Sequence, residues 1–318
     1  MGDRAFAHVP VMAGRVTALL APALAEPGVV LVDATLGRAG HARALLDLCP
    51  DLLLIGIDAD TAAIEAAREL LAPYAGRVRL VHARYDEIPA IVATAPAPVM
   101  GLLFDLGVSS PQLDDPARGF AYAQDAPLDM RMDQTGSRTA ADIVNGYPAA
   151  DLARVLRDYG EERFARRIAD AVVRERARAP ITSTRQLSAI VKDAIPAATR
   201  RTGGNPAKRT FQALRIEVND ELGTLRRALP AALGVLAVGG RVVVLAYHSL
   251  EDRIVKRELV RLSTEPAPPG LPIPVQAATA QFRLLTRGAE RPDSEEIADN
   301  PRAASARLRA AERIREAA

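Results

Sequence analysis

Short apolar runs and longer helical stretches alternate along the first hundred residues of the chain. The apolar runs are bounded by turn-forming residues, and they cover Val29–Leu36, Leu52–Ile57, Arg77–His82 and Val99–Leu106. Between them, His41–Leu48 and Thr61–Leu71 have the period of a helix. Apolar runs of this length predict strands, and strands that alternate with helices predict a parallel, doubly wound sheet. The pattern therefore indicates an α/β fold.

The alternation stops at about residue 107. Residues 107 to about 210 are polar, rich in arginine and helical in period, as in Ala150–Arg178, which Pro180 ends. The charges of Ala150–Arg178 are mixed in sign, which is typical of a solvated helix face. We therefore expect residues 111–210 to form an inserted helical domain.

The sheet pattern resumes after the insertion. It begins with a helix-like stretch at Arg215–Leu236 and a glycine turn at Gly239–Gly240. Three candidate strands follow, at Arg241–Tyr247, Phe282–Thr286 and Ser305–Arg309. The last two strands are expected at the edge of the sheet, after a proline-rich loop at residues 264–274. The sheet domain is therefore expected to comprise residues 1–110 and 211–318.

Composition narrows the class of protein. A chain of 318 residues with 49% hydrophobic and 25% charged residues is typical of a globular protein of about two domains. Cys49 is the only cysteine, so one chain forms no internal disulfide and no multi-thiolate metal site, and we expect this thiol to be inert. The formal net charge of +2 is too small to indicate a nucleic-acid partner by itself.

The apolar runs also bear on location. The longest have the length of a strand, and no basic segment followed by an apolar stretch opens the chain. We therefore expect neither a signal peptide nor a membrane span, and we expect a cytoplasmic protein.

A turn with two glycines joins the first predicted strand to the first predicted helix, at Gly37 and Gly40. Glycines there allow a ligand to approach the backbone, and the free N–H groups of the helix start face it. The spacing differs from the Gly-x-Gly-x-x-Gly of nicotinamide dehydrogenases, which disfavours a dinucleotide. Asp58 ends the second strand, 18 positions after Gly40, and suits a carboxylate that accepts both hydroxyl hydrogens of a ribose. The alternative is that Asp58 only caps the next helix.

Two further residues follow strands at the same edge. Tyr85, after the third strand, is placed to cover an adenine ring, and Asp105, at the end of the fourth, lies where a methyl donor and its acceptor would meet. Both inferences rest on position alone. Tyr85 is equally consistent with a half-buried strand residue, and Asp105 with a cap for the turn at Gly107.

Long strings in the rest of the chain resemble one family. They are Asp105–Asp114 (Asp-Leu-Gly-Val-Ser-Ser-Pro-Gln-Leu-Asp), Arg118–Phe120, Pro127–Asp133 (Pro-Leu-Asp-Met-Arg-Met-Asp), His8–Val11, Tyr159–Arg167, Arg209–Ile216, His248–Lys256 and Asn300–Arg302. With these strings, in this order, the chain resembles the bacterial 16S rRNA cytosine-N4 methyltransferases of the MraW/RsmH type. The resemblance covers nearly the whole chain.

The resemblance implies a Rossmann-like, class I methyltransferase fold with an inserted helical domain for substrate recognition. It implies transfer of a methyl group from S-adenosylmethionine to the exocyclic N4 of a cytidine in the decoding (P-site) region of 16S rRNA in the small ribosomal subunit, with no metal. Carried over position by position, the family's cofactor contacts fall on Ala39, Gly40, His41, Asp58, Tyr85, Asp105 and Gln112. His41 is expected beside the cofactor rather than as a base. Asp105, or carbonyls between Gly107 and Pro111, are candidate acceptors for the attacking amine.

The chain departs from the family at four positions. Ala39 replaces a glycine, Tyr85 a phenylalanine, Asn205 a histidine and Ala304 an arginine. Ala39 adds only a methyl group, which the turn tolerates if φ is negative there, and Tyr85 keeps a ring for stacking. The departures at Asn205 and Ala304 bear on RNA contacts.

Local clustering of charge is a second signal for RNA. No acidic residue occurs between Ala194 and Ile216, whereas the same stretch contains Arg200, Arg201, Lys208, Arg209 and Arg215. This cluster is a candidate phosphate-binding segment, and the alternative is a solvated loop. Aromatic rings that would support an extracted base are available at Phe120, Tyr122 and Phe211.

His248 follows the resumed strand and is a candidate contact for the base or its phosphate; alternatively it caps the helix that begins near Ser249.

Two other functions compete with this interpretation. DNA amino-methyltransferases typically carry an Asp/Asn/Ser-Pro-Pro-Tyr/Phe string after the fourth strand, where this chain has Asp105–Pro111. An assembly factor that binds RNA and cofactor without turnover would have the same signals, so product detection is needed to exclude it. The sequence leaves open whether two copies associate as a homodimer.

Overall fold

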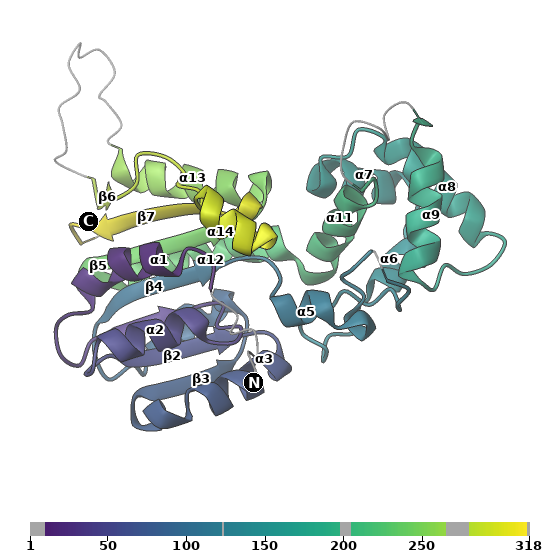
Figure 1. Cartoon of the computed structure of the whole chain (residues 1–318). Helices are drawn as coiled ribbons and strands as arrows, with labels where there is room; N and C mark the ends of the chain where they lie inside the picture. The colour runs from purple at the N-terminus through teal and green to yellow at the C-terminus, as the bar shows by residue number, and fades with distance from the viewer. Residues whose placement is uncertain (1–9, 123, 198–204, 265–279, 317–318) are drawn as a thin grey trace, which may run out of the picture. The chain divides into compact units, whose positions relative to one another are not determined.

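The computed structural model describes residues 10–122, 124–197, 205–264 and 280–316 (Figure 1). The chain divides into two compact units. The first, here called the sheet unit, runs up to Gly107 and resumes at Gly223; the second, the helical unit, comprises Val108–Leu222. None of the helices among the described residues is long and apolar enough to cross a membrane.

The sheet unit contains one seven-stranded sheet in the order β3-β2-β1-β4-β5-β7-β6 (Figure 1). In chain order the strands are β1 (Val30–Asp33), β2 (Leu53–Asp58), β3 (Val78–His82), β4 (Val99–Asp105), β5 (Leu236–Ala246), β6 (Phe282–Leu284) and β7 (Arg307–Arg313). The first five pair in parallel, β7 pairs antiparallel with β5, and β6 forms the edge. The predicted doubly wound, mostly parallel sheet is therefore confirmed.

Alternating strand residues supply the two apolar cores of this unit. Leu31 points to one face of the sheet, whereas Val30 and Val32 point to the other, as the period of two requires. The first face packs against α1 (Ala13–Leu20), α2 (Gly40–Leu48) and α3 (Thr61–Leu70). The second packs against α4 (Ile88–Val92), α12 (Glu221–Val235) and α13 (Ser249–Ser263). Burial on both faces explains why β1 is apolar at consecutive positions.

The predicted turn at Gly239–Gly240 lies inside a strand. β5 begins at Leu236, and its pairing with β4 shifts register between Val99 and Gly101. Gly239 has φ +84, a backbone conformation open to glycine, so the chain forms an irregularity in the ladder instead of ending the strand. The strand is therefore longer than the predicted Arg241–Tyr247.

The helical unit surrounds a separate core. Among the described residues its helices are α5 (Ser110–Asp114), α6 (Ala140–Gly146), α7 (Ala149–Gly160), α8 (Ala165–Arg176), α9 (Thr184–Ala194) and α11 (Lys208–Asn219). The predicted stretch Ala150–Arg178 is two helices, because Glu161 takes a left-handed conformation with φ 48. In the same way, Asp220 with φ 49 separates α11 from α12 within the predicted Arg215–Leu236.

From the sequence we expected the sheet domain to resume at residue 211, whereas the two units divide between Leu222 and Gly223. The reason is that α11 packs against α7. A Cβ built on Gly160, at the end of α7, would lie 2.6 Å from the carbonyl oxygen of Arg209. Glycine at this position permits the close approach that keeps α11 within the helical unit.

The remaining described elements are short: η1 (Ala21–Ala23), η2 (Ala72–Arg77), η3 (Tyr85–Glu87), η4 (Pro116–Arg118), α14 (Ser294–Asp299) and η5 (Pro301–Ser305). Most of the predicted loop at residues 264–274 lies outside the described residues. Cys49 is buried after α2, and burial raises the pKa of its thiol, as expected for an inert cysteine.

Candidate functional site

Three carboxylates occupy the carboxyl ends of neighbouring parallel strands. Asp33 ends β1, Asp58 ends β2 and Asp105 ends β4. The carboxyl ends of parallel strands meet at one edge of a sheet, which is where doubly wound folds bind ligands. Burial is the main reason that the pKa of Asp33 is raised, and the charges of Asp105 and Asp58 raise it further.

The turn after β1 adds backbone donors to this edge. The N–H of Gly37 (φ +50) donates to Asp58 Oδ2 at 2.8 Å. A Cβ on Gly40, the first residue of α2, would lie 2.5 Å from Pro10 Cγ. Gly40 therefore lets the N-terminal segment approach α2.

Ala39 differs from the expectation for this turn. Its φ is +58, in the left-handed region that favours glycine, and it is fully buried at the N-cap of α2. We expected the turn to tolerate the extra methyl group of alanine if φ were negative, and this condition is not met. For an L-residue this conformation costs roughly 1–2 kcal/mol, so the alanine places strain in the turn.

Asp58 is held by backbone groups on both oxygens. Besides the bond from Gly37, Oδ1 accepts from the N–H of Asp60 at 2.9 Å. The N-cap of α3 is Asp60, which accepts from Ala62 at 3.1 Å, so the alternative that Asp58 is the cap is wrong. Burial raises the pKa of Asp58. These backbone donors orient the carboxylate, which has further lone pairs to accept from a ligand.

Tyr85 begins η3 and is half-buried. Its ring meets the buried ring of Phe104 edge to face, with centroids 5.8 Å apart and planes at 82°. This contact holds the ring beside β4. Its contact with an adenine stays a prediction.

Asp105 has a partner that the sequence interpretation did not identify. The hydroxyl of Tyr247, the residue after β5, donates to Asp105 Oδ1 at 2.8 Å, and the N–H of Asp105 donates to Thr35 Oγ1 at 2.6 Å. Burial, together with the Asp105 charge, holds the pKa of Tyr247 well above its usual range. The phenol therefore stays protonated and keeps donating to Oδ1. Its position directly after a parallel strand was the available signal.

His41 and Asp33 are buried polar groups at the same edge. Both ring nitrogens of His41, which is 6% exposed, lack a hydrogen-bond partner in the described part of the chain. Nε2 lies 3.6 Å from Asp105 Oδ2, too far for a hydrogen bond. Burial raises the pKa of Asp33 to about 7, against the opposing effects of His41 and the N–H of Thr35. Buried polar atoms normally have partners, so the orphaned imidazole points to a ligand.

These residues fit S-adenosylmethionine. Asp58 is an oriented acceptor for ribose hydroxyls, the turn at Ala39–Gly40 brings backbone close to the site, and His41 offers unused ring nitrogens. The carboxylates also suit the positive charge of a sulfonium and an amino group.

Gln112, also expected at the cofactor, belongs to the helical unit. It is 6% exposed in α5, and its Oε1 accepts from the N–H of Ser109 at 3.0 Å in a capping box. Its contact with the cofactor stays a prediction.

The predicted RNA-binding residues differ in their surroundings. Arg200 and Arg201 lie outside the described residues. Lys208 and Arg209 are exposed at the start of α11. Arg215 forms a bidentate ion pair with Glu221, with both N···O distances 2.8 Å and side chains 15% and 9% exposed. Arg215 therefore has an ion-pair partner within the helical unit, and its contact with phosphate stays a prediction.

His248 takes the alternative role that the sequence left open. It is the N-cap of α13, where its Nδ1 accepts from the N–H of Glu251 at 3.4 Å. In return, Glu251 Oε2 accepts from the N–H groups of Tyr247 and His248 at 2.8 and 3.2 Å. This capping box also fixes the residue that bonds Asp105. A contact of His248 with RNA stays a prediction.

The aromatic rings proposed to support a base are mostly core residues. Phe120 and Phe211 are 6% and 4% exposed in the core of the helical unit. Tyr122 is half-buried and packs edge to face on Phe211 at 5.9 Å. Phe120 and Phe211 are therefore not exposed for stacking on a base in this structure.

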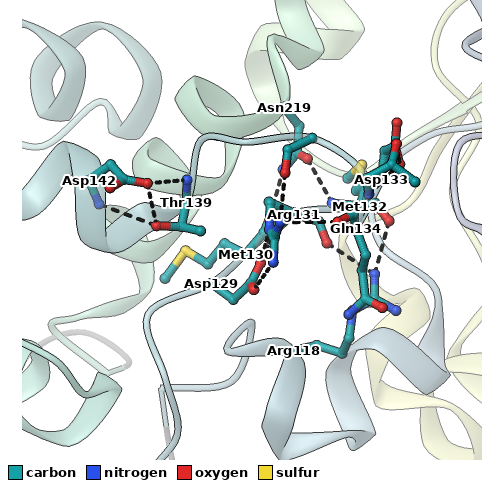
Figure 2. Close-up of polar contacts among 12 residues, drawn as sticks. Arg118, Asp129, Met130, Arg131, Met132, Asp133, Gln134, Thr139, Asp142 and Asn219 are labelled. Atoms are coloured by element: carbon teal, nitrogen blue, oxygen red, sulfur yellow. Dashed lines mark hydrogen bonds and ion pairs between the residues drawn. The ribbon is translucent and has the colours of Figure 1, made fainter.

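The string Pro127–Asp133 forms a polar network in the helical unit (Figure 2). Asn219 accepts from the N–H of Met132 and donates to the carbonyl of Met130, both at 2.8 Å, where Met130 has φ +62. Arg118 donates to the carbonyls of Arg131 and Met132 at 3.0 Å. The string therefore fixes a loop conformation.

The chain is similar to known methylases along nearly its whole length. The model of the MraW methylase family matches residues 5–314. A ribosomal RNA small subunit methyltransferase H from Thermobifida fusca is 65% identical over 316 residues, 99% of this chain and 96% of the relative. The protein of that name from Acidothermus cellulolyticus is 60% identical over 313 residues, 98% of this chain and 95% of the relative. A solved methyltransferase from Streptococcus mutans in complex with SAH has a TM-score of 0.41 at 11% identity, over 99% of this chain and 100% of the other.

Proposed function

The chain belongs to the MraW methylase family, and on that premise we propose that it methylates the exocyclic N4 of a cytidine in the decoding region of 16S rRNA. It is an S-adenosylmethionine-dependent methyltransferase. The observation that carries the proposal is the cluster of Asp33, Asp58 and Asp105 at one sheet edge, with the orphaned His41 among them. Relatives named for the small ribosomal subunit support 16S rRNA as the substrate.

The cofactor is held by the turn after β1 and by the ends of the next strands. Asp58, fixed by the Gly37 N–H, would accept from the ribose hydroxyls, and Ala39, Gly40 and His41 at the start of α2 would contact the cofactor. Tyr85 covers the adenine ring. When bound, S-adenosylmethionine supplies an electrophilic methyl group on a positively charged sulfur.

Asp105 is the candidate acceptor for the attacking amine. The N4 lone pair of cytosine is delocalised into the ring, and the nitrogen becomes positive as it attacks, so an acceptor aimed at its N–H stabilises the transition state. Tyr247 occupies Oδ1, which leaves Oδ2 to accept the hydrogen bond and then the proton. Asp105 is 27% exposed, consistent with access for a substrate base.

The helical unit is proposed to recognise the RNA around the target. Bases are read in RNA mostly where they are unpaired or extracted from the stack. Small subunits are assembled in the cytoplasm, and we place the enzyme there.

The test is methyl transfer from labelled S-adenosylmethionine to small subunits that lack native methylation, followed by nucleoside mass analysis. We expect N4-methylcytidine with the wild type and none with Asp58→Ala, because the variant loses the ribose acceptor. A different methylated nucleoside would reject the N4 target. Cofactor binding without any methylated product would favour the assembly factor.

A further inference from the structure

Helix α8 of the helical unit divides its residues between a buried and an exposed face. Ala165, Ile168, Ala169 and Val172 are at most 6% exposed and lie in the unit's core. Their spacing of three and four residues is that of one side of a helix. This side anchors α8, so the opposite side faces solvent.

The solvent side of α8 is strongly basic. Arg163, just before the helix, and Arg166, Arg167 and Arg174 are all exposed. They recur at spacings of three, four and seven residues, which places their guanidinium groups along one stripe. Asp170 is the one acid that α8 places there. We call these four arginines the α8 basic face.

Three arginines of the α8 basic face lack the internal partners that other arginines of the unit have, while Arg163 lies over the ring of Phe164 at 5.6 Å. Within the described residues, Arg166, Arg167 and Arg174 form neither an ion pair nor a side-chain hydrogen bond. In contrast, the exposed arginines of α7 and of the segment after α8 are paired, as Arg154–Asp151, Arg157–Asp158 and Arg178–Glu175 at 3.8, 2.8 and 3.0 Å. The mixed charges expected along Ala150–Arg178 are therefore separated: α7 is internally neutralised and α8 is not.

More positive charge lies at one end of this face. Arg209 Nη1 donates to the carbonyl oxygen of Glu161, in the turn between α7 and α8, at 3.0 Å. The start of α11 therefore lies against the segment that leads into Arg163. Arg209 and the neighbouring Lys208 are exposed, as is the acidic Glu161.

We propose that the α8 basic face binds phosphate groups of 16S rRNA and so docks the enzyme on the small subunit. The inference rests on the proposed function, which supplies the RNA. Guanidinium groups bind phosphate oxygens in a bidentate manner, and unpaired ones lose no ion pair when they do so. From Arg166 to Arg174 the helix rises about 12 Å, a length that reaches more than one phosphate.

The test is the salt dependence of binding to small ribosomal subunits. The variant Arg166→Gln/Arg167→Gln/Arg174→Gln removes three charges from exposed positions. If each contacts one phosphate, the magnitude of the slope of log K against log salt falls by about 2–3, because each contact contributes roughly 0.7–0.9. The matched control is Arg154→Gln/Arg157→Gln/Arg178→Gln, which has the same net charge and removes only paired arginines.

The two variants separate local contact from overall charge. We expect the control to keep a slope close to that of the wild type, with both variants folded by circular dichroism. Equal slopes for the two variants, reduced or not, would overturn the proposal. The titration requires no turnover. A wild type that binds subunits but methylates nothing would contradict the proposed reaction, whereas the slopes would still decide whether the α8 basic face binds phosphate.

Discussion

At the scale of single residues, the turn between β1 and α2 places an alanine, Ala39, in a backbone conformation that favours glycine. Glycine at position 39 would relieve the left-handed strain of roughly 1–2 kcal/mol, and part of this gain is offset by the lost methyl group and the greater freedom of the unfolded chain. We expect Ala39→Gly to stabilise the protein by about 0.5 kcal/mol. The control Ala42→Gly, equally buried but inside α2, should destabilise it by about 1 kcal/mol. Urea unfolding measures both, and equal losses would show that Ala39 is unstrained.

Asp33 gives a pH dependence of known sign. Its pKa rises from 3.8 to about 7 on folding, mainly through burial. The unfolded chain therefore releases this proton at lower pH than the folded chain does. The free energy of unfolding consequently falls as pH rises from about 4 to 7, because only the folded state still holds the proton there. Asp33→Asn removes this ionisation. The cofactor-free variant should therefore gain stability relative to the wild type over that window, by up to a few kcal/mol, in urea unfolding at several pH values. A constant difference across the window would contradict the shifted pKa.

Residue types at strand ends were predictable, and their partners were not. Asp58 and Asp105 were identifiable because a parallel sheet gathers the ends of its strands at one edge. Tyr247 was missed because its bond to Asp105 joins residues 142 positions apart. Arg215 was assigned to RNA because a sequence shows its charge but not the ion pair with Glu221.

At the scale of elements, apolar periodicity predicted the strands, but the positions of glycines did not predict where helices and strands end. Glu161 follows α7 in a left-handed conformation that its residue type does not favour, and Asp220, a type that adopts it more readily, does the same after α11. Conversely, Gly239–Gly240 resembled a turn and lies within β5. Helix boundaries set by tertiary packing are not encoded in local periodicity.

The loop around Met130 makes an element-scale prediction. Asn219 supplies its side-chain amide to two backbone groups of this loop and to the carbonyl of Arg215 at 2.9 Å. Asn219→Ala removes the bonds to the Met132 N–H and the Met130 carbonyl, so we expect a loss of about 2 kcal/mol. Gln134→Ala, at an exposed position of the same loop, should cost less than about 0.5 kcal/mol. The comparison is made by thermal unfolding, and similar melting temperatures for both variants would mean that the network adds nothing.

At the scale of the molecule, the chain combines a sheet unit that holds the cofactor site with an inserted helical unit that carries the α8 basic face. The insertion was predictable because the strand pattern stops after β4 and resumes at β5. Its end was not, since α11 belongs by packing to the helical unit although it directly precedes α12. Together, the two proposals assign the chemistry to the sheet unit and RNA docking to the helical unit.

The central claim is that the Asp105 carboxylate, oriented by Tyr247, receives the attacking amine at the end of β4. The most direct measurement is the single-turnover rate of methyl transfer to small subunits, for the wild type and Asp105→Asn, each with cofactor occupancy set by a binding measurement. We predict that the variant transfers the methyl group at least about 100-fold more slowly at equal occupancy, because the amide cannot accept the proton. A variant that transfers at the wild-type rate when equally loaded would contradict the account.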